Sequence, residues 1–105
     1  MLKERIKQMQ EGFDNPALLE KLYFDLGVDL GVYNDSLIDH LQDCRIRKNI
    51  LRKQEFKSVA SFNQAFEESD EYYILKAYKY KIKATEQMKS SVRVRLNGLL
   101  TELNN

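Results

Sequence analysis

The twelve residues 72–83, YYILKAYKYKIK, hold four tyrosines and four lysines. Lysine side chains can follow a phosphate backbone and tyrosine rings can stack on unpaired bases, so this composition suits a surface that binds single-stranded nucleic acid. The same residues could also form an edge strand or the solvated outside of a helix. The elements that carry the segment therefore decide what its chemistry is.

The rest of the chain offers little other chemistry. His40 and Cys44, the single histidine and the single cysteine, lie one helical turn apart, whereas a structural zinc site normally needs four ligands. Asp25 and Asp29 also lie one turn apart, but the ExxH motifs of di-iron bundles are missing, so we interpret these carboxylates as solvated. The sequence contains no glycine-rich phosphate loop and no pattern of an activated nucleophile. We predict a protein that is not an enzyme and uses no metal and no cofactor.

Length and composition indicate a folded protein. The chain has 105 residues, of which 43% are hydrophobic and 31% charged, values typical of one folded domain. A single cysteine excludes an intramolecular disulfide. The charged N-terminus does not resemble a signal peptide, and no uncharged apolar run reaches the roughly 18 residues that span a bilayer. We predict a single domain, residues 1–105, in the cytoplasm and without membrane association.

Two long stripes of apolar residues recur at helical spacing, each advancing about 3.5 residues per step, which is typical of amphipathic helices. The first stripe consists of Leu19, Leu22, Leu26, Leu30, Tyr33, Leu37, Leu41, Cys44 and Leu51, with Lys48 filling the one gap. The second consists of Leu75, Tyr78, Ile82, Thr85, Met88, Val92, Leu96, Leu99 and Leu103.

The stripes predict an all-α fold, an antiparallel hairpin of two long helices with coiled-coil-like packing. We expect a short N-terminal helix over 1–13 with Leu2, Ile6 and Met9 on one side, and a long helix over 16–56. A connector follows over 58–69 with a short helix, and then a second long helix over 70–103.

Capping residues support these boundaries. Asn15 is predicted to cap the first long helix, with Pro16 at its first position; Ser61 should cap the connector helix and Asp70 the last one. Gly31 weakens the first long helix, and Asn34-Asp35-Ser36 could cap a new one. We favour one helix, and a bend near Gly31 or a break between Gly31 and Ser36 stays open.

A hairpin of this kind buries little surface by itself, so we also predict that the chain forms homo-oligomers. Its charge is unevenly distributed. Residues 45–57 carry a net charge of +5 and residues 76–95 of +6, against −5 for residues 1–44 and −4 for residues 58–75. In an antiparallel hairpin the two basic blocks are expected to meet and form one basic end that could bind phosphates. Alternatively, this charge pattern drives head-to-tail assembly, or the acidic connector neutralises the basic helices.

The helical pattern also sorts the tyrosines and lysines, with Tyr78 and Ile82 directed inward and their neighbours outward. The residues predicted to contact phosphates are Arg45, Arg47, Lys48, Arg52, Lys53, Lys76, Lys79 and Lys83. Those predicted to stack on bases are Tyr72 and Tyr80.

The basic run Arg45-Ile46-Arg47-Lys48-Asn49-Ile50-Leu51-Arg52-Lys53, followed by a connector and a helix rich in tyrosine and lysine, resembles small helical recombination-associated proteins of tailed phages and, more distantly, the UvsY-type recombination mediators. The resemblance covers a little over half of the chain. It implies an oligomeric protein that binds single-stranded DNA and helps to load a recombinase. The chain departs from the mediators at residues 95–105, which lack their Arg-aromatic-Ile-Lys signature.

The leading hypothesis is therefore a self-associating helical protein that binds single-stranded nucleic acid through a basic hairpin end, as an accessory factor of phage recombination or replication. The alternative is a protein-binding adaptor or inhibitor, anti-defence or replication-associated, whose protein partner docks on an exposed seam from Leu75 to Leu103. A third hypothesis is a purely structural coiled-coil assembly factor.

Overall fold

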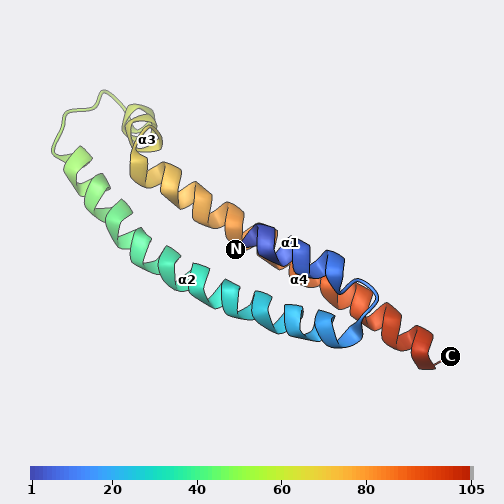
Figure 1. The fold of residues 1–105 in the computed structure, drawn as a ribbon. Coiled ribbons are helices and arrows are strands. Elements are labelled where there is room, and N and C mark those ends of the chain that lie inside the picture. The colour runs from blue at the N-terminus through green and yellow to red at the C-terminus, as the bar shows by residue number, and fades with distance from the viewer. Residues whose placement is uncertain (105) are drawn as a thin grey trace. The chain divides into compact units, whose positions relative to one another are not determined.

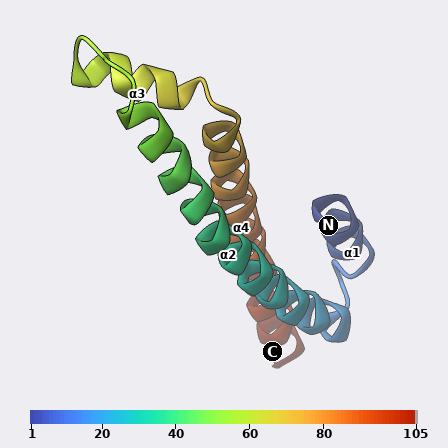
Figure 2. The same ribbon diagram turned by 90° about the vertical axis from the view of Figure 1, so that its left-hand side faces the viewer.

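The computed structural model describes residues 1–104, with side chains as far as Glu102. Within this range it contains four helices and no strand: α1 (Leu2–Glu11), α2 (Pro16–Arg52), α3 (Val59–Glu67) and α4 (Asp70–Asn104) (Figure 1). The two long helices pack against each other (Figures 1 and 2). The predicted all-α helical hairpin is therefore confirmed. The side chain of Leu103, the last predicted stripe position, lies outside the described residues.

Packing divides the chain into two compact units, and each contains part of α2 and part of α4. Unit 1 comprises Met1–Val32 together with the chain from Ile82 onward, and unit 2 comprises Tyr33–Lys81. Each unit has a hydrophobic cluster of its own.

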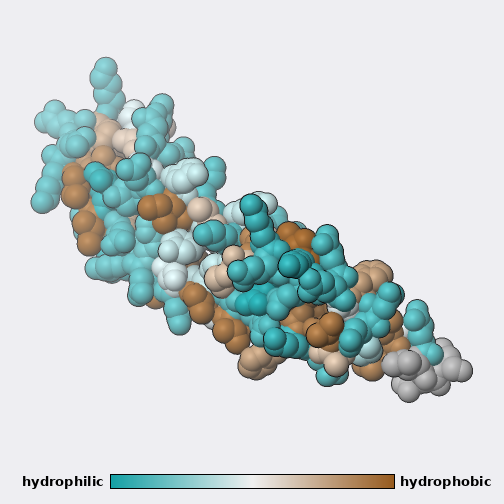
Figure 3. Space-filling model, in the orientation of Figure 1, coloured by the Kyte–Doolittle hydropathy of each residue, from teal (hydrophilic) through white to brown (hydrophobic). Residues whose placement is uncertain are grey.

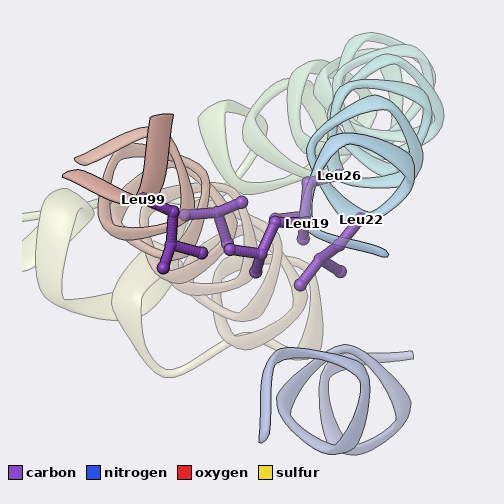
Figure 4. Close-up of a cluster of buried hydrophobic side chains, with 5 residues drawn as sticks. Leu19, Leu22, Leu26 and Leu99 are labelled. Atoms are coloured by element: carbon purple, nitrogen blue, oxygen red, sulfur yellow. The ribbon is translucent and has the colours of Figure 1, made fainter. Parts of the chain in front are cut away.

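The cluster of unit 1 consists mainly of leucines. Leu19, Leu22 and Leu26 of α2 form one buried cluster with Leu99 of α4 (Figure 4), and Val92 completes the buried set. Because Leu19, Leu22 and Leu26 lie three or four residues apart, one face of α2 presents all three to α4.

A buried ion pair fastens α1 to α2 in unit 1. The guanidinium of Arg5 donates hydrogen bonds to both carboxylate oxygens of Asp29, at 2.7 and 3.0 Å, and Asp29 is buried. Our interpretation of this carboxylate as solvated is wrong, because a bidentate guanidinium compensates for the loss of water. Arg5 and Met9 both make inward contacts from α1. Of the predicted apolar side, Leu2 and Met9 are half-buried, whereas Ile6 is exposed.

The cluster of unit 2 depends on the connector. Phe66 of α3 is buried with Cys44 and Leu51 of α2 and Leu75 of α4. α3 thus covers apolar surface that the end of α2 and the start of α4 leave open.

Two predicted caps are replaced by serines that precede them. The hydroxyl of Ser58 accepts the N–H of Ser61 at 3.1 Å, so Ser58 caps α3 and Ser61 lies in its first turn. Similarly, Ser69 accepts the N–H of Tyr72, and Asp70 is the first residue of α4. Both corrections have one cause, since an N-cap side chain bonds the N–H two or three residues later and these serines stand at that distance.

The predicted cap of α2 is confirmed, because Asn15 Oδ1 accepts the N–H groups of Ala17 and Leu18. The helix ends at Arg52 rather than at residue 56. Phe56 lies beyond the end of the helix and is half-buried against the unit 2 cluster. Its ring packs edge-on against Phe62 of α3, with 5.6 Å between ring centroids.

α2 runs without interruption from Pro16 to Arg52, so the alternative of a break between Gly31 and Ser36 is wrong. Most stripe positions are buried or half-buried, but Leu41 is exposed because His40 takes the inward position. The seam that begins at Leu75, predicted to be an exposed docking surface for a protein partner, is instead covered within the chain as far as Leu99. Leu75, Val92 and Leu99 are core residues of the chain itself.

Candidate nucleic-acid interface

The segment YYILKAYKYKIK lies in α4, so the strand interpretation is excluded. Leu75 points into the unit 2 cluster, and two tyrosines two helical turns apart remain outside it. Tyr73 is 75% exposed and Tyr80 is 71% exposed. These are the most exposed aromatic side chains of unit 2 among the described residues.

Tyr72 does not lie on the outer face, contrary to the prediction. Its ring packs edge-on against Phe66, with centroids 5.6 Å apart, and contacts the buried cluster. The ammonium group of Lys76 lies 5.7 Å from the centroid of the Tyr72 ring. Tyr73 was not among the residues predicted to stack on bases. The pattern of two paired helices does not show that Phe66 of α3 packs against Tyr72 on this side of α4 and leaves Tyr73 exposed.

The lysines of the segment stay at the surface. Lys76 and Lys79 are exposed on the same turns as the two tyrosines, and within the described part of the chain neither forms a salt bridge. Lys81 lies 6.0 Å from the ring centroids of Tyr33 and Tyr78. Lys83 is also exposed but belongs to unit 1.

A shallow groove runs beside this surface in unit 2. It is lined by Tyr73, Ile74, Ala77, Tyr78 and Lys81. It therefore combines an exposed tyrosine, apolar side chains and a cation, which are the groups that contact a base and its backbone.

Three of the five basic residues predicted on α2 have contacts with other side chains of the protein. Arg47 donates to Glu71 at 3.0 Å, and the ammonium group of Lys48 lies 4.7 Å from the Phe66 ring centroid. Arg52 donates to Asn49 and lies over the ring of Phe62. Arg45, Arg52 and Lys53 are exposed.

The two basic blocks do not lie side by side as predicted but follow each other along unit 2, with Lys48 and Lys79 both close enough to Cys44 to act on its charge. In unit 2, His40 is level with Tyr78, and Arg47 is level with Glu71. This register places residues 45–53 beside α3 and the acidic first turn of α4, while Lys76 lies beside the preceding turns of α2. The reason is that α4 begins with an acidic turn, so its lysines start more than one turn further along.

His40 and Cys44 have structural partners in unit 2. His40 Nε2 lies 2.7 Å from the carbonyl oxygen of Glu71, and Cys44 Sγ lies 3.8 Å from the same oxygen. Burial raises the pKa of the Cys44 thiol, and nearby Glu71 raises it further. Among the described residues, no group of three or more His, Cys, Asp or Glu side chains is placed to hold a metal ion.

Searches of protein families, of curated proteins and of solved structures find no match to this chain. The resemblance to recombination mediators therefore stays a prediction. None of the helices, over the range that the structure describes, has the length and apolar character required to cross a membrane.

Proposed function

We propose that this protein binds single-stranded nucleic acid through the outer face of α4 in unit 2. The observation that carries the proposal is the pairing of two largely exposed tyrosines, Tyr73 and Tyr80, with the exposed lysines Lys76 and Lys79. A water-facing tyrosine keeps both faces of its ring available to bases, and lysines on adjacent turns can reach the phosphates between them.

Unit 2 is nearly neutral, so base stacking should contribute a substantial part of the binding free energy. Unit 2 holds nine basic and eight acidic side chains, and Arg47, one of the nine, is paired with Glu71. We therefore expect only about two phosphate contacts. The logarithm of the affinity should fall with the logarithm of the salt concentration, with a slope of roughly 0.7 for each contact to a single strand.

The test is fluorescence anisotropy of a labelled single-stranded oligonucleotide titrated with the protein at several salt concentrations. Replacing both tyrosines, Tyr73→Ser with Tyr80→Ser, should weaken binding at least about tenfold, since one stacked base contributes about 1–3 kcal/mol. Tyr73→Phe with Tyr80→Phe should bind like the unchanged protein. Lys76→Glu with Lys79→Glu should lower the affinity and flatten the salt dependence.

A matched control places the same change of charge elsewhere, with Lys3→Glu and Lys21→Glu on exposed positions of unit 1. This variant should bind nearly as well as the unchanged protein. The proposal fails if the serine variant binds like the phenylalanine variant, or if the unchanged protein shows no binding at low salt.

A second candidate function, that of a protein-binding adaptor, is favoured by a different observation in unit 1. Phe24 is 69% exposed, and Val28 and Val32 follow it at intervals of four residues, each 50% exposed. Hydrophobic patches of this kind are visible on the hydrophilic surface (Figure 3). They suit an amphipathic helix of a partner protein, and such binding would respond little to salt.

A further inference from the structure

The part of α2 that belongs to unit 2 has a face that no other element of the unit covers. Its buried residues, including Cys44 and Leu51, point into the cluster, and three isoleucines lie away from it. Ile38 is 64% exposed, Ile46 50% and Ile50 44%. A single exposed isoleucine is ordinary, but three within four turns of one helix indicate a surface that is covered by something.

The charges on this face change sign halfway along it. Asp35 and Asp39 are exposed on its first half, and Arg45 and Lys53 are exposed on its second half or directly after it. The four residues lie within unit 2, over about 27 Å along α2 and the residue that follows it. The face is therefore acidic at one end and basic at the other, with isoleucines at both ends.

We propose that a second copy of this chain packs on this face in antiparallel orientation. A two-fold axis perpendicular to the helices would place the acidic half of each copy against the basic half of the other. With the axis beside residue 43, Asp39 would lie near the partner copy's Arg45 and Asp35 near the partner copy's Lys53, and Ile38 would pack between the partner copy's Ile46 and Ile50. A parallel pair would place like charges together, which opposes association.

Charge complementarity favours a second copy over an unrelated partner. A face that reverses its own charge along its length is complementary to itself under a two-fold rotation, and both ion-pair sets form at once. The contact of one helix face is smaller than a standard protein interface, so we expect a dissociation constant on the order of micromolar. The inference does not depend on nucleic-acid binding, because it concerns α2 rather than the outer face of α4.

Sedimentation equilibrium without oligonucleotide tests the proposal on two charge-reversal variants. The first carries Asp35→Lys and Asp39→Lys, so that its face is basic throughout. The second carries Arg45→Glu and Lys53→Glu, so that its face is acidic throughout. Each variant alone should be monomeric at concentrations where the unchanged chain is dimeric, with association at least about tenfold weaker, whereas an equimolar mixture should form a heterodimer.

Control variants carry equal changes of charge on exposed residues of unit 1, Glu20→Lys with Glu86→Lys and Lys3→Glu with Lys21→Glu. Each control should dimerise alone, as the unchanged chain does. Thermal unfolding followed by circular dichroism verifies that all variants are folded.

Three results would overturn the proposal: a monomeric unchanged chain, dimers that persist in both reversal variants, or no heterodimer in their mixture. The Tyr73→Ser and Tyr80→Ser variant should keep the dimer. Failure of this inference is thereby distinguished from failure of nucleic-acid binding.

Discussion

At the scale of single residues, the neighbours of a side chain decide its role more than its type does. Tyr72 and Tyr73 are adjacent, yet the first packs on Phe66 and the second is exposed. Asp29 is buried because the guanidinium of Arg5 compensates its charge. Glu71 joins α4 to α2 by accepting a hydrogen bond from Arg47.

The pair of Arg47 and Glu71 predicts a specific pH dependence of stability. The hydrogen bond from Arg47 lowers the pKa of Glu71 below its ordinary value of 4.5. The folded state therefore holds this carboxylate ionised more firmly than the unfolded state does, so its contribution to the free energy of unfolding is complete above pH 4.5 and is lost as the pH falls further. Glu71→Gln should be less stable than the unchanged protein at pH 7, and the difference should shrink in acid.

Urea unfolding at a series of pH values measures this difference. Glu67→Gln is the matched control, because it makes the same change of charge at an exposed carboxylate at the end of α3. A destabilisation by Glu71→Gln that stays constant into acid would contradict the assignment.

At the scale of elements, caps and glycines determine where the helices begin and whether they continue. Ser58 and Ser69 start α3 and α4. Gly12, between α1 and α2, lies so close to Leu18 that an added Cβ would be 2.9 Å from the Leu18 Cβ. Gly31 lies inside α2 with nothing within 4 Å of the position of an added Cβ.

Gly31→Ala is therefore expected to stabilise the protein by about 0.5–1 kcal/mol, because alanine loses less backbone entropy than glycine in a helix and meets no neighbour here. Gly12→Ala should destabilise it, since the added methyl group is too close to Leu18. Chemical denaturation of the two variants provides the comparison. A destabilising Gly31→Ala would show that this position needs glycine for a reason beyond helix propensity.

At the scale of the whole molecule, opposite charges alternate along the chain and largely neutralise each other. The chain carries 17 basic and 16 acidic side chains, and unit 1 holds equal numbers of each. Such a molecule has no strong field to attract polyanions from a distance. Binding of nucleic acid would then depend on local contacts of the α4 surface.

This charge balance predicts a preference between nucleic acids. A single strand should bind at least about tenfold more tightly than a duplex of the same length, because the duplex offers more phosphate charge but no unpaired bases for Tyr73 and Tyr80. Competition of unlabelled duplex against a labelled single strand measures the ratio. Equal affinity, or tighter binding of the duplex, would mean that charge rather than stacking governs the interaction.

The sequence by itself determined the four helices, the hairpin class and most core positions, because a stripe of apolar residues at helical spacing is a local property of the chain. Element ends were less accurate: α2 stops at Arg52 because Phe56 packs on α3, a contact between residues of different elements. The candidate surface depended even more on tertiary structure. The register of α2 against α4 places the basic blocks one after the other rather than side by side, and Phe66 decides which tyrosine is exposed. Periodicity states which face of a helix is apolar, but only the packed fold determines which neighbour covers it and at what level along the partner helix.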